Sequence, residues 1–64
     1  MDKQGFTVIY YDGNEMCKII VQSNGPVEIF ESPEQFEEFG PDTIIHAVLC
    51  GNYIDEVILQ EEIS

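Results

Sequence analysis

The stretch GFTVIYYDGNEMCKIIVQS, residues 5–23, contains two runs of β-branched and aromatic residues on either side of Asp12-Gly13. Such runs are typical of β-strands. An Asp-Gly pair tolerates the positive φ angles of a type I′ turn, so the stretch predicts a hairpin with Asp12 and Gly13 as its turn residues. In that register Val8 lies opposite Cys17. Period-two alternation then gives the hairpin one apolar face, made of Phe6, Val8, Cys17, Ile19 and Val21.

A third strand is predicted over Pro26–Glu31, because the pair Asn24-Gly25 repeats the turn chemistry just before it. Pro26 cannot donate a backbone hydrogen bond, but it is acceptable as the first residue of a strand. The first half of the chain is therefore predicted to be a three-stranded antiparallel meander.

A short helix is predicted next, within residues 32–40. The tetrapeptide SPEQ, residues 32–35, has the form of a capping box with proline at the first helical position. Gly40 and Pro41 end the helix after about two turns. Because so short a helix is not stable alone, Phe36 and Phe39 are predicted to dock it on the sheet.

The remaining residues favour a second hairpin. Thr43–Cys50 is rich in β-branched residues, and Gly51-Asn52 suits a type II′ turn into a last strand over residues 53–60. A helix over Thr43–Cys50 is the competing interpretation, with Asp42 and Gly51 as its caps. The prediction is one α+β domain over residues 1–64, with an antiparallel sheet of about five strands in the order β-β-β-α-β-β and one short helix.

The charge of the chain restricts its partners. Thirteen Asp and Glu residues stand against two lysines, Lys3 and Lys18, and there is no arginine, so the formal net charge is −11. Binding to DNA, RNA or an anionic membrane needs Lys and Arg and is effectively excluded. After Lys18 come 46 residues with ten acids and no basic residue. The expected partner is a basic protein.

The two cysteines, Cys17 and Cys50, and the N-terminal sequence predict a cytoplasmic protein. No signal peptide follows Met1, and the longest apolar run is too short to span a bilayer. In a reducing compartment two distant cysteines are more often small apolar core residues than a disulfide.

The chain lacks the residue sets that catalysis needs, so it is predicted not to be an enzyme and to need no cofactor. His46 is the sole histidine and lies in an apolar run, which favours a structural role. His46 and Cys50 are four residues apart and hence expected on one strand face, where Cys17 could join them in a zinc site. Because that spacing is nonspecific, no metal is predicted.

The acidic residues are the candidate binding residues. Carboxylates at positions i and i+4 of a helix are about 6 Å apart along its axis, and those at i and i+2 of a strand are about 6.6 Å apart. Both spacings are close to that of successive phosphates in a nucleic-acid strand. The predicted contact residues are Glu31, Glu34, Glu37 and Glu38 around the helix, with Asp55, Glu56, Glu61 and Glu62 in the last hairpin and tail. Whether the two groups share a face depends on the strand order.

Three features carry a resemblance to a known group of proteins: the length of the chain, its charge of a single sign, and the acidic segment ESPEQFEEFG beside a hairpin-rich sheet. In these features the chain resembles the small acidic inhibitors made by bacteriophages. These include the DNA-mimicking anti-CRISPR proteins and the uracil-DNA glycosylase inhibitors. The resemblance implies a non-enzymatic inhibitor whose carboxylates replace phosphates and which prevents DNA recognition by a Cas complex.

The alternative is an acidic immunity or antitoxin module that covers a basic toxin or enzyme. Charge complementarity between an acidic module and a basic partner explains this alternative as well as it explains a nucleic-acid mimic. In that case aromatic anchors should dominate the contact, with Tyr10, Tyr11 and Tyr53 as candidates. Five short strands would leave at least one free edge, so the chain could be a monomer or a homodimer.

Overall fold

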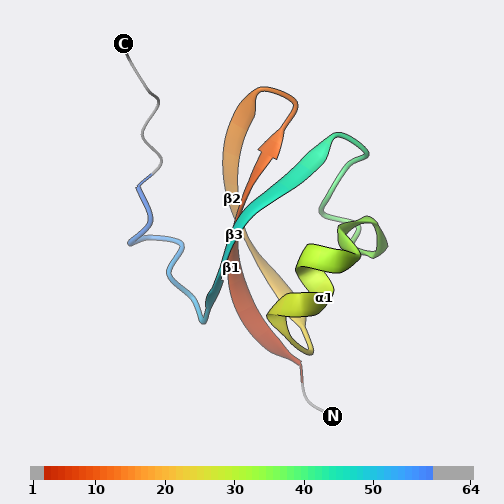
Figure 1. Cartoon of the computed structure of the whole chain (residues 1–64). Helices are drawn as coiled ribbons and strands as arrows, with labels where there is room; N and C mark the ends of the chain where they lie inside the picture. Colours follow the sequence, from red (N-terminus) through yellow and green to blue (C-terminus); the bar gives the residue numbers. More distant parts are fainter. Residues whose placement is uncertain (1–2, 59–64) are drawn as a thin grey trace.

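The computed structural model describes residues 3–58 (Figure 1). Its elements are β1 (Gln4–Asp12), β2 (Glu15–Ser23), α1 (Pro26–Glu31), the 3-10 helix η1 (Pro33–Gln35) and β3 (Thr43–Cys50). The strands form one antiparallel sheet in the order β2-β1-β3. The protein is thus a small α+β fold, but the prediction of five strands is wrong because the described residues form three.

The β1–β2 hairpin is present, with a turn one residue later than predicted. Asp12 pairs with Glu15, so Gly13 and Asn14 are the turn residues. Gly13 has φ 68°, whereas no residue other than glycine has a positive φ in the described chain. A type II′ turn needs a positive φ only at its first central position, which glycine fills here. Val8 consequently pairs with Ile19 rather than Cys17, and this shift of two residues preserves the predicted apolar face.

The predicted third strand over Pro26–Glu31 is instead the helix α1. Pro26 occupies the first helical position, where its missing N–H costs nothing. Glu28, in the first turn, reaches back to accept hydrogen bonds from the Ser23 hydroxyl and from the Asn24 backbone N–H. These two hydrogen bonds stabilise the turn that carries the chain out of β2 and into the helix, although the N-cap residue Gly25 has no side-chain cap.

The predicted two-turn helix after Ser32 is reduced to η1. The side chain of Ser32 makes no capping hydrogen bond, and Phe36 already has an extended backbone. Continuing the helix would place Glu34, Glu37 and Glu38 within one turn of each other, and like charges at that spacing are destabilising. Phe36 and Phe39 nevertheless dock on the sheet as predicted.

The prediction of a strand over Thr43–Cys50 is confirmed, and the competing helix is wrong. β3 pairs with β1, so β1 is the central strand and β2 and β3 are the edges. The register shifts by one residue at His46, which forms a β-bulge between Ile45 and Ala47. Residues 53–58 form no strand, so the predicted second hairpin is absent from the described chain, and residues 59–60 lie outside it.

The core lies between the sheet and the segment containing α1 and η1. Its buried apolar side chains are Phe6, Val8, Val21, Ile29 and Phe39. The Phe39 ring packs edge-on against Tyr10, with ring centroids 5.1 Å apart. In Figure 1, α1 covers one face of the sheet and the segment after β3 runs along the other. None of the helices in the described part is long and apolar enough to cross a membrane.

Candidate protein-binding surface

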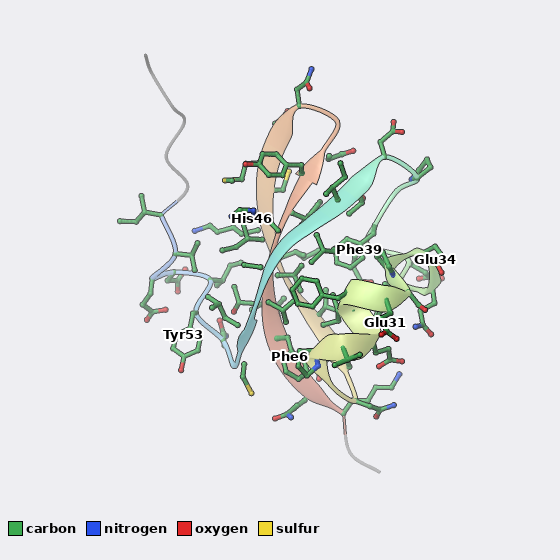
Figure 2. The ribbon with its side chains drawn as sticks, in the orientation of Figure 1. Phe6, Glu31, Glu34, Phe39, His46 and Tyr53 are labelled. Atoms are coloured by element: carbon green, nitrogen blue, oxygen red, sulfur yellow. The ribbon has the colours of Figure 1, made fainter. Side chains whose placement is uncertain are left out.

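Four of the predicted contact residues lie on the segment that covers the core. Glu31 ends α1, Glu34 belongs to η1, and Glu37 and Glu38 form the turn that follows. All four side chains are exposed. Figure 2 shows Glu31 and Glu34 on the side of this segment that faces away from the sheet. The fold therefore brings this group together, and we call it the helix-side acids.

Three further acids gather at one end of the sheet, where none was predicted as a contact. Asp12 and Glu15 flank the hairpin turn and form a cross-strand pair. Asp42 immediately precedes β3, and its backbone oxygen accepts a hydrogen bond from Gly13 N–H at 3.5 Å. All three side chains are exposed. The sequence contains these residues, but only the pairing of β3 with β1 shows that they are neighbours.

Asp55 and Glu56, the predicted contacts in the last hairpin, lie on the opposite side of the molecule. They belong to the segment after β3, which crosses the sheet face away from α1 (Figure 1). Glu61 and Glu62 lie outside the described residues. The two predicted groups therefore do not share one face in the part of the chain that the structure describes.

Thr7 and Lys18 hold the segment after β3 against the sheet. The Thr7 hydroxyl is fully buried; it donates to the Gly51 carbonyl oxygen at 2.7 Å and accepts from Tyr53 N–H at 2.8 Å. Gly51 has φ 117°, a value that favours glycine, and it turns the chain back across β1. The Lys18 ammonium donates to the carbonyl oxygens of Ile54 and Val57, at 2.6 and 2.7 Å. One of the two lysines is thus engaged far from the helix-side acids.

Replacing Lys18 by methionine is expected to release this segment while leaving the sheet intact. Hydrogen bonds that involve a charged group contribute about 1.5–3 kcal/mol each, but the freed carbonyls can turn to water. We therefore expect the free energy of local opening of this segment to fall by about 1–2 kcal/mol, which corresponds to roughly 5–30-fold faster hydrogen exchange. The measurement is hydrogen exchange at the amides of Glu56 and Val57, which donate to the Tyr53 carbonyl.

Lys3→Met is the matched control for this prediction, because it removes the same charge from the exposed start of the chain. It should leave the exchange of both amides unchanged. Equal exchange in the Lys18→Met variant and the unmodified protein would show that the ammonium does not hold the segment.

Glu28 is the acid whose carboxylate is already engaged inside the protein. The hydrogen bond from Ser23 lowers the pKa of the Glu28 carboxyl most, followed by the hydrogen bond from the Asn24 backbone N–H. The charge of Lys3 makes a smaller contribution in the same direction. A carboxylate held in this way is committed to the turn between β2 and α1. We therefore do not count Glu28 among the residues that are free to meet a partner.

The tyrosines predicted as anchors are only partly available. Tyr10 packs on Phe39, and its burial raises the pKa of the phenol. Tyr11 is half-buried and lies edge-on to the His46 ring, with centroids 5.8 Å apart. Tyr53 is exposed, on the side away from α1. Val27 and Phe30 of α1, which no sequence argument selected, are the large exposed apolar residues nearest the helix-side acids along the described chain.

The structure separates the residues considered for a zinc site. Cys17 pairs with Tyr10 on the core face, whereas His46 contacts Tyr11 on the other face. The bulge at His46 also changes the alternation along β3, so the expectation that His46 and Cys50 share a strand face is wrong. Residues 3–58 contain no group of three or more His, Cys, Asp or Glu side chains that could hold a metal ion. Both cysteines are free thiols.

The chain matches no protein-family model, no curated protein and no solved structure.

Proposed function

We propose that this protein is a non-enzymatic inhibitor that imitates the phosphates of a nucleic acid and occupies the basic groove of a DNA- or RNA-binding protein. One observation carries the proposal. Exposed carboxylates follow the chain from α1 through η1 to the start of β3, while Lys18 is bonded to carbonyl oxygens on the other side. The acids on this path, with the two that flank the hairpin turn, are Glu31, Glu34, Glu37, Glu38, Asp42, Asp12 and Glu15.

The mechanism is ordinary DNA binding with the charges of the protein reversed. Lys and Arg in the target groove attract the carboxylates as they would attract phosphates, and salt weakens the attraction. A large field of a single sign also accelerates the encounter of the two proteins. Competition with nucleic acid follows, because both ligands need the same basic side chains.

The target that we favour is the groove in which a Cas complex recognises duplex DNA, which would make the protein an anti-CRISPR protein. A basic groove that accommodates a short duplex is a surface that a 64-residue protein could fill. A uracil-DNA glycosylase is the next candidate. Either target acts in the cytoplasm, where free thiols such as Cys17 and Cys50 stay reduced.

The proposal is tested by changing Glu34, Glu37 and Glu38 together to glutamine. The target is first isolated from a bacterial lysate on the immobilised protein and is then challenged with duplex DNA and with rising salt. Exposed charge pairs contribute about 0.2–1 kcal/mol each, so we expect the triple variant to bind about 3–150-fold more weakly. Its fold should be unchanged or slightly more stable, because repulsion between the acids is reduced.

For equal charge, the helix-side pair Glu37→Gln with Glu38→Gln is measured as well. Its matched control is Asp55→Asn with Glu56→Gln, which removes two charges from the segment on the other face of the sheet. This variant should bind as well as the unmodified protein. A target that DNA does not displace would refute mimicry. Unchanged affinity in the helix-side variant, combined with loss in the control, would place the contact on the C-terminal side.

The exposed apolar residues of α1 favour a second candidate function, an acidic immunity or antitoxin module. Val27 is 62% exposed and Phe30 49% exposed, and such side chains serve as interface anchors more readily than as phosphate mimics. The same experiment separates the two functions. A small basic toxin or nuclease that is retained, and that DNA does not release, would indicate the module.

A further inference from the structure

The outward face of α1 combines apolar and acidic side chains. Ile29 is fully buried and therefore defines the inward face of the helix. At about 100° per residue, Val27 and Glu31 point away from Ile29, and Phe30 lies beside Val27. Val27 is three residues from Phe30 and four from Glu31, so its side chain neighbours both of them on the helix surface. Figure 2 shows Glu31 directed away from the sheet.

This exposed apolar pair is unexpected in so small a domain. Burying the side chain of a Val or Phe residue contributes about 1.5–3 kcal/mol, and the core offers only five buried apolar residues in the described chain. Rotating α1 to bury Phe30 would expose Ile29 instead. The helix therefore retains two apolar side chains that no other part of residues 3–58 covers.

We propose that this face binds a basic amphipathic helix of the partner, with Val27 and Phe30 packed against its apolar residues and Glu31 and Glu34 paired with its Lys or Arg side chains. The inference rests on the proposed function, because it uses the same surface. It adds an apolar anchor to a contact that would otherwise be purely ionic.

The charges around Val27 and Phe30 select this occupant over two others. In a symmetric contact between two copies, the same face meets itself, so the Glu31 carboxylates of the two copies would lie close together. An anionic membrane would be repelled by the helix-side acids. A cationic helix is attracted by the same carboxylates, and its side-chain ridges fit the i, i+3 spacing of Val27 and Phe30.

The test uses two synthetic peptides of equal length and equal lysine content. The first forms a helix with leucine on one face and lysine on the other, and in the second alanine replaces every leucine. Fluorescence anisotropy measures the binding of each labelled peptide. We expect Phe30→Ala to weaken binding of the leucine peptide by about 5–30-fold, the range expected for losing an aromatic anchor, and to leave binding of the alanine peptide unchanged.

Tyr53→Ala is the matched control, because Tyr53 is a comparably exposed aromatic residue next to acids, on the other side of the molecule. It should bind the leucine peptide normally. Circular dichroism should show that both variants are folded. Equal peptide binding by Phe30→Ala and the unmodified protein would overturn the inference, as would a Phe30-dependent dimer in sedimentation without peptide.

The two proposals fail in different ways. Mimicry fails if duplex DNA does not displace the captured target. The proposed apolar anchor is refuted if Phe30→Ala leaves binding of the leucine peptide intact, whether or not duplex DNA displaces the captured target.

Discussion

Replacing Phe6 by alanine is expected to lower the free energy of unfolding by about 3–5 kcal/mol. Phe6 is fully buried, belongs to the central strand β1 and pairs with Val21 of β2, also fully buried. The substitution removes most of a large side chain and leaves a cavity that a close-packed core fills poorly. A domain of this length has a total stability of only about 3–10 kcal/mol. We therefore expect the variant to be largely unfolded at 37 °C.

The measurement is urea unfolding followed by circular dichroism, with Phe30→Ala as the matched control. Phe30 undergoes the same chemical change at an exposed position, and the expected cost there is within about 1 kcal/mol. If both variants lost the same stability, Phe6 would not be the centre of the core.

Replacing Ile29 by alanine is expected to cost about 2–5 kcal/mol. Ile29 is the only buried residue of α1, and a helix of six residues does not persist in water without packing. Losing this contact should therefore detach the helix as well as create a cavity. The expected observations are a lower unfolding midpoint in urea and fast hydrogen exchange at the Ser32 amide, which donates to the Glu28 carbonyl.

Val27→Ala provides the control for Ile29, because Val27 lies on the opposite, exposed face of the same helix. Alanine has the higher helix propensity, so this variant should be as stable as the unmodified protein or slightly more stable. A large loss of stability in Val27→Ala would mean that α1 docks through another face.

The elements that could be predicted are those with local sequence signals. The hairpin of residues 5–23 and the strand Thr43–Cys50 both follow from β-branched content and turn chemistry. The turn itself was ambiguous, because Asp12-Gly13 suits a type I′ turn and Gly13-Asn14 suits a type II′ turn. Only the complete sheet selects between them, through the pairing of Asp12 with Glu15 and with Thr43.

The identity of α1 shows where local patterns fail. The strand over Pro26–Glu31 was predicted because Asn24-Gly25 repeats the turn chemistry of a hairpin, and this local signal was misleading. The decisive signals were Pro26 at the first helical position and Glu28 two residues later, a pattern typical of a helix start. The burial of Ile29 also favours the helix over a strand. That burial depends on tertiary contacts with residues far away in the sequence, which a local pattern does not contain.

The candidate site was predictable in part. Glu31, Glu34, Glu37 and Glu38 lie within eight residues, so any compact structure keeps them close together. The separation of Asp55 and Glu56 from this group could not be predicted, because it depends on the path of the chain after Gly51. That path is fixed by the Thr7 hydroxyl, 44 positions earlier in the sequence, which accepts and donates hydrogen bonds inside the protein.

The central position of β1 has a kinetic consequence. β2 and β3 are both hydrogen-bonded to β1 and not to each other. The turn at Gly13 lets β1 and β2 find each other within microseconds. β3 has to close a loop of about thirty residues before it pairs, at an entropic cost that grows with loop length. We expect the arrival of β3 to limit the folding rate, so a nascent chain passes through a two-stranded stage with one side of β1 still open.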